Sequence, residues 1–167
     1  MYARKFLPAT IALAALLAGC TPATPPAAPD TRDADAKAIR QLEVDWAQAF
    51  AAKDADKAVS FYADDASLFL GGRPVITGRD NIANVWKQYL ADKNFSLTFS
   101  TNKVIVSKSG DMGSTQGSCA MTYTDPKTKK AVSEKCKYVE VYMKQADGSW
   151  KDVADIGNAD GPPTPVK

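Results

Sequence analysis

The second half of the chain predicts an antiparallel β-sheet, and this pattern constrains the fold more than any other feature. From Phe95 onward, apolar and polar residues alternate with the period of two that is typical of strands. Turn-forming residues interrupt the alternation at 109–111, 125–130 and 147–148, and Asp147-Gly148 is a strong two-residue hairpin signal. We therefore expect strands over residues 95–106, 114–124, 132–144 and 150–156.

Helical periodicity dominates the residues before the sheet. We expect a long first helix, a short second helix capped by Asp54 or Asp56, and a third helix with Thr77 and Asp80 in capping-box spacing. The first helix covers residues 34–52 with Ile39, Leu42, Trp46, Ala49 and Phe50 as its apolar stripe, the second carries Val59, Phe61 and Tyr62, and the third carries Ile82, Val85, Trp86, Tyr89 and Leu90. Short strands at 67–70 and 74–76 separate the second and third helices. Three helices packed on an antiparallel sheet define an α+β fold.

The strand that contains Cys136 is apolar on both faces. Tyr138 and Tyr142 share one face, and Val139, Val141 and Met143 share the other. We expect helices to cover one face and a second copy of the chain, in a homodimer, to cover the other.

Two cysteines lie in the hairpin on either side of the turn at 125–130. If the turn is centred between Lys127 and Thr128, Cys119 faces Cys136 directly across the two strands. Cross-strand Cβ atoms lie about 4.5 to 5.5 Å apart, which is close to what a disulfide needs. We therefore expect a Cys119–Cys136 disulfide, which suits the oxidising compartment of an exported protein. A zinc or redox site is the alternative, although two cysteines without any histidine make a poor zinc site.

The N-terminus has the pattern of an exported bacterial lipoprotein. Basic Arg4 and Lys5 precede an apolar run over residues 6–19, which is shorter than the roughly 20 residues that span a bilayer. Leu17-Ala18-Gly19-Cys20 resembles the lipobox, in which the cysteine is acylated and becomes the first residue of the mature chain. Thr21 resembles the residue found there in lipoproteins of the outer membrane, facing the periplasm in a Gram-negative cell. An ordinary secretory signal with a chance cysteine is the alternative.

These features divide the chain into four segments. We expect a signal peptide over residues 1–19, the acylated Cys20 and a Pro/Ala-rich tether over 20–33, one domain over 34–160 and a flexible tail over 161–167. Removal of the signal peptide takes Arg4 and Lys5 from the 21 basic residues, which leaves 19 basic and 19 acidic ones. Because nucleic-acid binding requires a basic stripe, we expect no nucleic-acid partner.

The stretch 54–66, followed by Gly71-Gly72-Arg73-Pro74 and Thr77-Gly78-Arg79-Asp80, resembles the nuclear transport factor 2-like superfamily, which includes ketosteroid isomerases and SnoaL-like proteins. The resemblance covers nearly the whole domain. The ending 148–158 resembles a bacterial family, domain of unknown function 4440, in which an aspartate and an asparagine close the last strand. The superfamily implies a curved sheet wrapped around helices, a cone with an apolar pocket, and often a dimer.

Comparison with the isomerases implies different chemistry at two positions. Trp46 falls where the isomerases place a proton-donating tyrosine, and Leu70 falls at or next to their catalytic aspartate. Indole is a donor only and leucine is neither acid nor base, so we do not expect steroid-type isomerisation. The chain contains no histidine, which excludes a Ser-His-Asp triad and histidine-bound metals. We expect neither a metal nor a cofactor.

Asp155 is the candidate catalytic residue, because a carboxylate in an otherwise apolar final strand can face the interior of the cone as a general acid or base. The alternative is a hydrogen bond between strand ends or a position in water. Asp45 is a weaker candidate, since an exposed carboxylate is the ordinary expectation on the first helix. We expect a ligand pocket lined by Trp46, Phe50, Tyr62, Trp86, Tyr89 and Asn158. The helical spacing of the aromatic residues equally fits core packing.

These observations predict a protein that binds a small, largely apolar molecule at the membrane surface. One alternative is a cofactor-independent SnoaL-like enzyme in which Asp155 transfers a proton. Another is a dimeric interaction module whose pocket is filled by side chains. The fold hosts catalysts and non-catalysts alike, so the site must decide between them.

Overall fold

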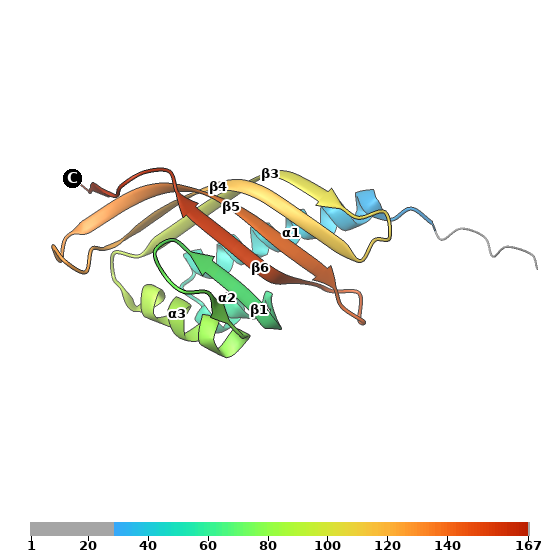
Figure 1. Cartoon of the computed structure of the whole chain (residues 1–167), viewed down its shortest axis with the longest axis horizontal. Coiled ribbons are helices and arrows are strands. Elements are labelled where there is room, and N and C mark those ends of the chain that lie inside the picture. The colour runs from blue at the N-terminus through green and yellow to red at the C-terminus, as the bar shows by residue number, and fades with distance from the viewer. Residues whose placement is uncertain (1–28, 167) are drawn as a thin grey trace, which may run out of the picture.

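The computed structural model describes residues 29–166, which form three helices and one curved sheet (Figure 1). The elements in chain order are α1 (Arg32–Ala51), α2 (Ala55–Val59), β1 (Tyr62–Leu70), β2 (Ile76–Thr77), α3 (Arg79–Ala91), β3 (Ser96–Val106), β4 (Met112–Thr124), β5 (Ala131–Lys144), β6 (Trp150–Ala159) and β7 (Thr164–Pro165). This is the expected α+β class. The signal peptide, Cys20 and most of the tether lie outside the described residues. Within residues 29–166, no helix is long and apolar enough to cross a membrane.

The sheet is mixed rather than purely antiparallel, which corrects the expectation from the sequence. Its strand order is β2-β1-β6-β5-β4-β3, and β7 pairs with β5 outside this path. β1 runs parallel to β6, while the other neighbours are antiparallel. Turn signals in the sequence reveal only hairpin neighbours. The pairing of β1 with β6 joins strands that are far apart in the chain, so no local signal announces it.

The helices differ from the expectation mainly at their ends. Asp54 caps α2 as expected by accepting a hydrogen bond from the Lys57 amide, but α2 ends at Val59. Phe61 therefore lies beyond the helix, and Tyr62 begins β1. The expected capping box is wrong, because the N-cap of α3 is Gly78 with φ at +90° and no side chain caps it.

Two other segments also depart from the expectation. The β5–β6 connection has three residues rather than the expected two. The Gln145 amide donates to the Ser149 carbonyl across this loop, and φ of Gly148, the last loop residue, is +83°. This is the three-residue hairpin with a left-handed glycine. The tail that we expected to be flexible contains β7, in which Thr164 and Pro165 pair with the start of β5.

The cysteine hairpin forms with the expected register. Cys119 lies opposite Cys136 in the β4–β5 pair, and the Asp125 amide donates to the Lys130 carbonyl at the turn. The two cysteines are joined in a disulfide with their Cα atoms 4.7 Å apart. This prediction is therefore confirmed.

The core lies between the helices and the concave face of the sheet. Trp46 is at its centre: its ring lies within 4.9 to 6.4 Å of the rings of Phe50, Phe61, Tyr62 and Phe99. Edge-to-face and stacked pairs at such distances each add about 0.5 to 1.5 kcal/mol beyond area burial. Aromatic packing from α1, β1 and β3 therefore joins the helical layer to the sheet.

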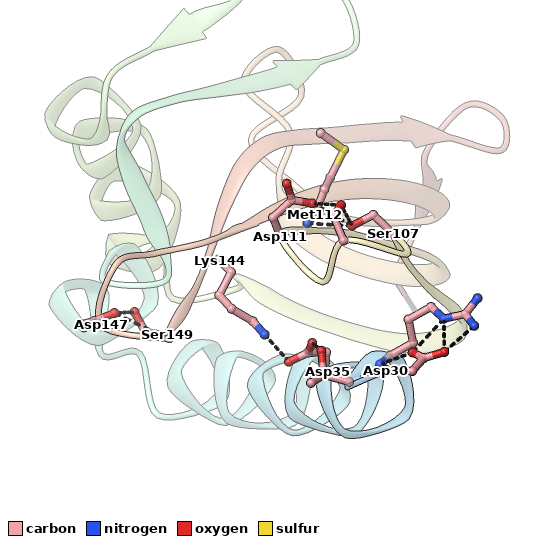
Figure 2. A network of polar contacts seen from close by, with 11 residues as sticks. Asp30, Asp35, Ser107, Asp111, Met112, Lys144, Asp147 and Ser149 are labelled. Carbon is pink, nitrogen blue, oxygen red and sulfur yellow. Dashed lines mark hydrogen bonds and ion pairs between the residues drawn. The ribbon is translucent and has the colours of Figure 1, made fainter. Parts of the chain in front are cut away.

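A network of polar contacts joins the start of α1 to the sheet (Figure 2). Asp35 is 7% exposed, accepts a hydrogen bond from Thr31 Oγ1 at 2.7 Å, and pairs with Lys144 Nζ of β5 at 2.6 Å. The neighbouring β3–β4 turn packs against the same place, since a Cβ at Gly110 would lie 2.8 Å from Thr31 Oγ1. The turn itself is held by Ser107 Oγ, which donates to Asp111 Oδ1 at 2.8 Å.

Candidate functional site

A pocket of about 630 Å³ opens between the helices and the concave face of the sheet. Its aromatic wall comes from α1, α3 and the inner face of the sheet. Its other lining residues come from β1, the β1–β2 connection, β3, the β4–β5 hairpin and β6. The aromatic lining residues are Trp46, Phe50, Trp86, Tyr89, Phe99, Tyr123 and Tyr138. A volume of this size suits a small organic molecule.

Strand register places Asp155 on the inner face. Asp155 of β6 pairs with Leu68 of β1 on one side and Glu140 of β5 on the other, and all three side chains share the concave face. The next residue, Ile156, therefore points outward and is exposed. Asp155 and Glu140 both line the pocket, so two carboxyl groups stand side by side at its wall.

The pocket residues that we expected from the sequence lie together in the pocket lining, with one exception. Trp46, Phe50, Trp86, Tyr89 and Asn158 all line the pocket. Tyr62 does not, because it is fully buried in the core. Tyr62 is connected to the pocket through Asp155, because its hydroxyl donates a hydrogen bond to the Asp155 carboxyl. The roles of these six residues in ligand binding stay predictions.

A chain of two hydrogen bonds holds the Asp155 carboxyl in place. Tyr62 Oη donates to Asp155 Oδ2 at 2.6 Å, and Trp86 Nε1 donates to Tyr62 Oη at 3.0 Å. Burial raises the pKa of Asp155 to about 6, with the Tyr62 hydrogen bond acting in the opposite direction and Glu43 adding to the rise. Asp155 can therefore gain or lose a proton close to neutral pH.

A second acidic cluster, Glu43 and Glu140 around Tyr142, lies beside Asp155. Tyr142 Oη is 2.9 Å from Glu43 Oε1 and 2.5 Å from Glu140 Oε2. A phenol has one proton and can donate to only one of these carboxyl groups, so the other must be protonated and donate in return. Burial and the nearby Glu43 raise the pKa of Glu140 well above its usual range. The proton is therefore held on Glu140.

Other hydroxyl groups complete the hydrogen bonding of this cluster. Tyr138 Oη donates to Glu43 Oε2 at 3.1 Å, and Thr115 Oγ1 donates to Glu140 Oε2 at 3.1 Å. Gly117 makes the first of these contacts possible, because a Cβ at this position would overlap the Tyr138 ring. Two buried carboxyl groups are thus satisfied by neutral donors rather than by cations.

Asp152 is a further buried acid that does not reach the pocket. Its side chain is fully buried, and neither carboxyl oxygen has a hydrogen-bond partner among the described residues. Burial and the charge of Asp155 raise the pKa of Asp152 well above its usual range. The neutral acid is therefore the favoured form, since an unpaired buried charge is costly.

The sequence contains signals for Glu43 and Glu140, two of the acids that the prediction from sequence did not include. Glu43 follows Ile39 by four residues and precedes Trp46 by three, which places it on the apolar stripe of α1. Glu140 lies between Tyr138 and Tyr142 on the alternating inner face of β5. Asp45, which we considered instead, lies off the stripe, does not line the pocket and accepts a hydrogen bond from Gln41.

The two positions compared with the isomerases carry no acid or base here. Trp46 is 1% exposed, and its Nε1 has no hydrogen-bond partner among residues 29–166. Leu70 lines the pocket from the end of β1. The acids of the pocket wall instead come from the β4–β5 turn, β5 and β6. In the described part of the chain, no three acidic, histidine or cysteine side chains converge as a metal site would require.

Comparison with known proteins identifies the family. The sequence matches the SnoaL-like domain over residues 32–153, and the chain belongs to this family of the nuclear transport factor 2-like superfamily. A comparison with curated proteins found no match.

Solved structures with the same fold support this assignment. A ketosteroid isomerase-like protein from Erwinia carotovora atroseptica is 23% identical with a TM-score of 0.67, and the match covers 77% of this chain and 98% of that one. A nuclear transport factor 2-like superfamily protein from Salmonella enterica is 14% identical with a TM-score of 0.64, covering 78% and 94%. One of unknown function from Pseudomonas putida is 20% identical with a TM-score of 0.63, covering 78% and 89%. At these identities, the likeness shows the fold alone.

Proposed function

We propose that this protein binds a small, largely apolar molecule in the pocket between its helices and its sheet. The observation that carries the proposal is a cavity of about 630 Å³ walled by seven aromatic residues, with the Asp155 carboxyl at its wall. Aromatic walls with a few placed polar groups are characteristic of small-molecule sites. We also propose that the domain has the cone shape implied by the superfamily, with this pocket inside the cone.

Native mass spectrometry of the mature chain, exported so that its disulfide forms, tests this function directly. We expect an additional small-molecule mass that is lost on denaturation. The matched variant is Met121→Trp, which places a large ring in the pocket lining and should abolish retention while circular dichroism remains unchanged. Retention of the same mass by this variant would place the ligand elsewhere.

Proton transfer by Asp155 is a second candidate function, supported by one specific observation. Its carboxyl lines the pocket, is oriented by Tyr62, and has its pKa raised to about 6 by burial. A general acid or base works best when its pKa is near the operating pH. The proton transfer that we propose uses no cofactor. Once a ligand is identified, its α-proton exchange in deuterated water should stop in Asp155→Asn and continue in Asp65→Asn.

We also propose that the mature chain is a lipoprotein held at the cell envelope by acylated Cys20, in the outer membrane of a Gram-negative cell. The basis is the lipobox at residues 17–20 and the Pro-rich tether that follows it. Cys20→Ser should move the protein from the membrane fraction to the soluble periplasmic fraction or leave an uncleaved precursor. Unchanged membrane retention of a cleaved Cys20→Ser chain would contradict a lipid anchor.

The partner that we propose for the convex face of the sheet is a second copy of the chain. Val139, Ile156 and Phe69 lie side by side on β5, β6 and β1, and each is more than one third exposed. Met112 and Met143 form another exposed cross-strand pair on the same face. Contiguous exposed apolar residues mark interaction surfaces. Such a row can pair with its own copy about a two-fold axis.

A further inference from the structure

The pocket lining is acidic as well as aromatic. Four carboxyl groups contribute to it: Asp125, Glu134, Glu140 and Asp155. Among the described residues, Arg73 is the only basic side chain that lines the pocket, and its guanidinium lies 5.8 Å from the centre of the Tyr89 ring. Even with Glu140 protonated, the lining carries more negative than positive charge.

None of these four acids is paired with a cation in the described part of the chain. Glu134 has the Tyr123 hydroxyl at 3.3 Å, and Asp125 accepts backbone hydrogen bonds within its own turn. Asp155 accepts one hydrogen bond from Tyr62 through Oδ2, while Oδ1 accepts none from the described residues. The carboxylate facing the cavity thus has one oxygen still available to a donor.

The aromatic rings near these acids provide a second attraction for a positive charge. Trp86 binds Tyr62, which in turn binds Asp155, and Tyr138 lies two residues from Glu140 on the same face of β5. The faces of such rings carry negative electrostatic potential, and a cation above them gains about 0.5 to 2 kcal/mol. Carboxylate and rings together make a site that favours a cation.

We infer that the ligand of this pocket is a protonated amine on an apolar body. The inference rests on the binding function proposed above and names its ligand class. The ammonium group donates a hydrogen bond to Asp155 Oδ1, Tyr62 keeps Oδ2, and the apolar body fills the space between the rings of α3 and β3. A carboxylate ligand would meet Asp155 with like charge, and a neutral ligand would leave the Asp155 charge without a cation beside it.

Calorimetry with three compounds of matched shape tests the inference. The probes are 1-naphthylmethylamine, 1-naphthylmethanol and 1-naphthoate at neutral pH, added to the mature chain carrying Cys20→Ser so that it has no lipid. We expect the amine to bind at least about tenfold more tightly than the alcohol, which corresponds to about 1.4 kcal/mol, and the naphthoate to bind most weakly. Equal or tighter binding of the alcohol overturns the inference, but leaves the binding function standing. Binding of none of the three contradicts the binding function itself.

Two variants assign the charge preference to one residue. Asp155→Asn keeps an oxygen that can accept the Tyr62 hydrogen bond, and we expect it to weaken amine binding to the level of the alcohol without weakening alcohol binding. Asp65→Asn removes the same charge from an exposed position outside the pocket and should preserve the preference. An unchanged preference in Asp155→Asn would overturn the inference, and a loss in Asp65→Asn would assign it to overall charge.

Discussion

Asp152 and Asp155 lie three positions apart on β6 and differ in what surrounds them. The Asp155 carboxyl accepts a hydrogen bond from Tyr62 and lines the pocket, whereas the Asp152 carboxyl is fully buried without a partner among the described residues. Burial raises the pKa of both groups, to about 6 for Asp155, where the Tyr62 hydrogen bond opposes the rise, and well above its usual range for Asp152. Asp155 thus suits chemistry or binding, and we expect Asp152 to lower stability at neutral pH.

We predict that Asp152→Asn stabilises the protein at neutral pH. The raised pKa means that the folded state keeps a proton which the unfolded state releases above its ordinary pKa of 3.8. The free energy of unfolding therefore falls by about 1.4 kcal/mol for each pH unit over which only the folded state holds this proton. The variant has no proton to lose, so its advantage should grow as pH rises from about 4 to about 7.

Urea denaturation at several pH values measures this difference. Asp65→Asn serves as the control, because Asp65 is exposed and should keep the slope of the parent protein. Parallel pH profiles for the parent and Asp152→Asn would show that Asp152 ionises in the folded state, contrary to our argument.

The β4–β5 hairpin is closed by the Cys119–Cys136 disulfide. Its disulfide closes a loop over a sequence separation of 17 and lies in the pocket lining. We predict that replacing Cys119 and Cys136 together by alanine lowers the free energy of unfolding by about 3 kcal/mol on the chain-entropy account. Urea unfolding measures the loss. Reduction should lower the stability of the parent protein by a similar amount and leave the double variant unchanged; equal stability of oxidised parent and variant would refute this account.

The ion pair between α1 and β5 should contribute far more than an exposed pair. Burial opposes ionisation of Asp35, but hydrogen bonds from Lys144 and Thr31 outweigh it and lower the pKa of Asp35. Lys144→Met leaves this buried carboxylate without its cation, and we expect a loss of about 2 kcal/mol in thermal or urea unfolding. Lys87→Met breaks an exposed pair with Asp56 and should change stability by about 0.5 kcal/mol or less. Equal effects of the two substitutions would contradict a special role for the buried pair.

At the scale of the molecule, the convex face of the sheet is where we expect association. We predict a dimer whose interface includes the row of Val139, Ile156 and Phe69, because this row is apolar and exposed in the single chain. Val139→Lys places a charge in the middle of the row and should yield monomers in analytical ultracentrifugation. Ala146→Lys, in the exposed β5–β6 turn, should leave the dimer intact. A parent chain that sediments as a monomer at high concentration would exclude this interface.

Local patterns predicted the parts of the fold that depend on near neighbours. Helical spacing predicted α1 and α3. Spacing also predicted that Asp54 or Asp56 caps α2, and Asp54 is the residue that accepts the Lys57 amide three positions away. Counting outward from one turn paired Cys119 with Cys136 correctly. These features arise from contacts between residues close in sequence, whose geometry follows from backbone periodicity alone.

What only the tertiary structure decided is the parallel pairing of β1 with β6 and the acidic wall of the pocket. The hydrogen bonds from Tyr62 to Asp155 and from Tyr142 to Glu43 join residues 93 and 99 positions apart. Each of these residues belongs to its own strand or helix, and no periodicity in the sequence relates the position of one hydrogen-bond partner to that of the other. Burial depends on the same non-local packing, and it is burial that raises the pKa of Asp155 and Glu140. The sequence by itself determined most of the elements and one hairpin register, while the chemistry of the site arose only when the distant strands and α1 came together.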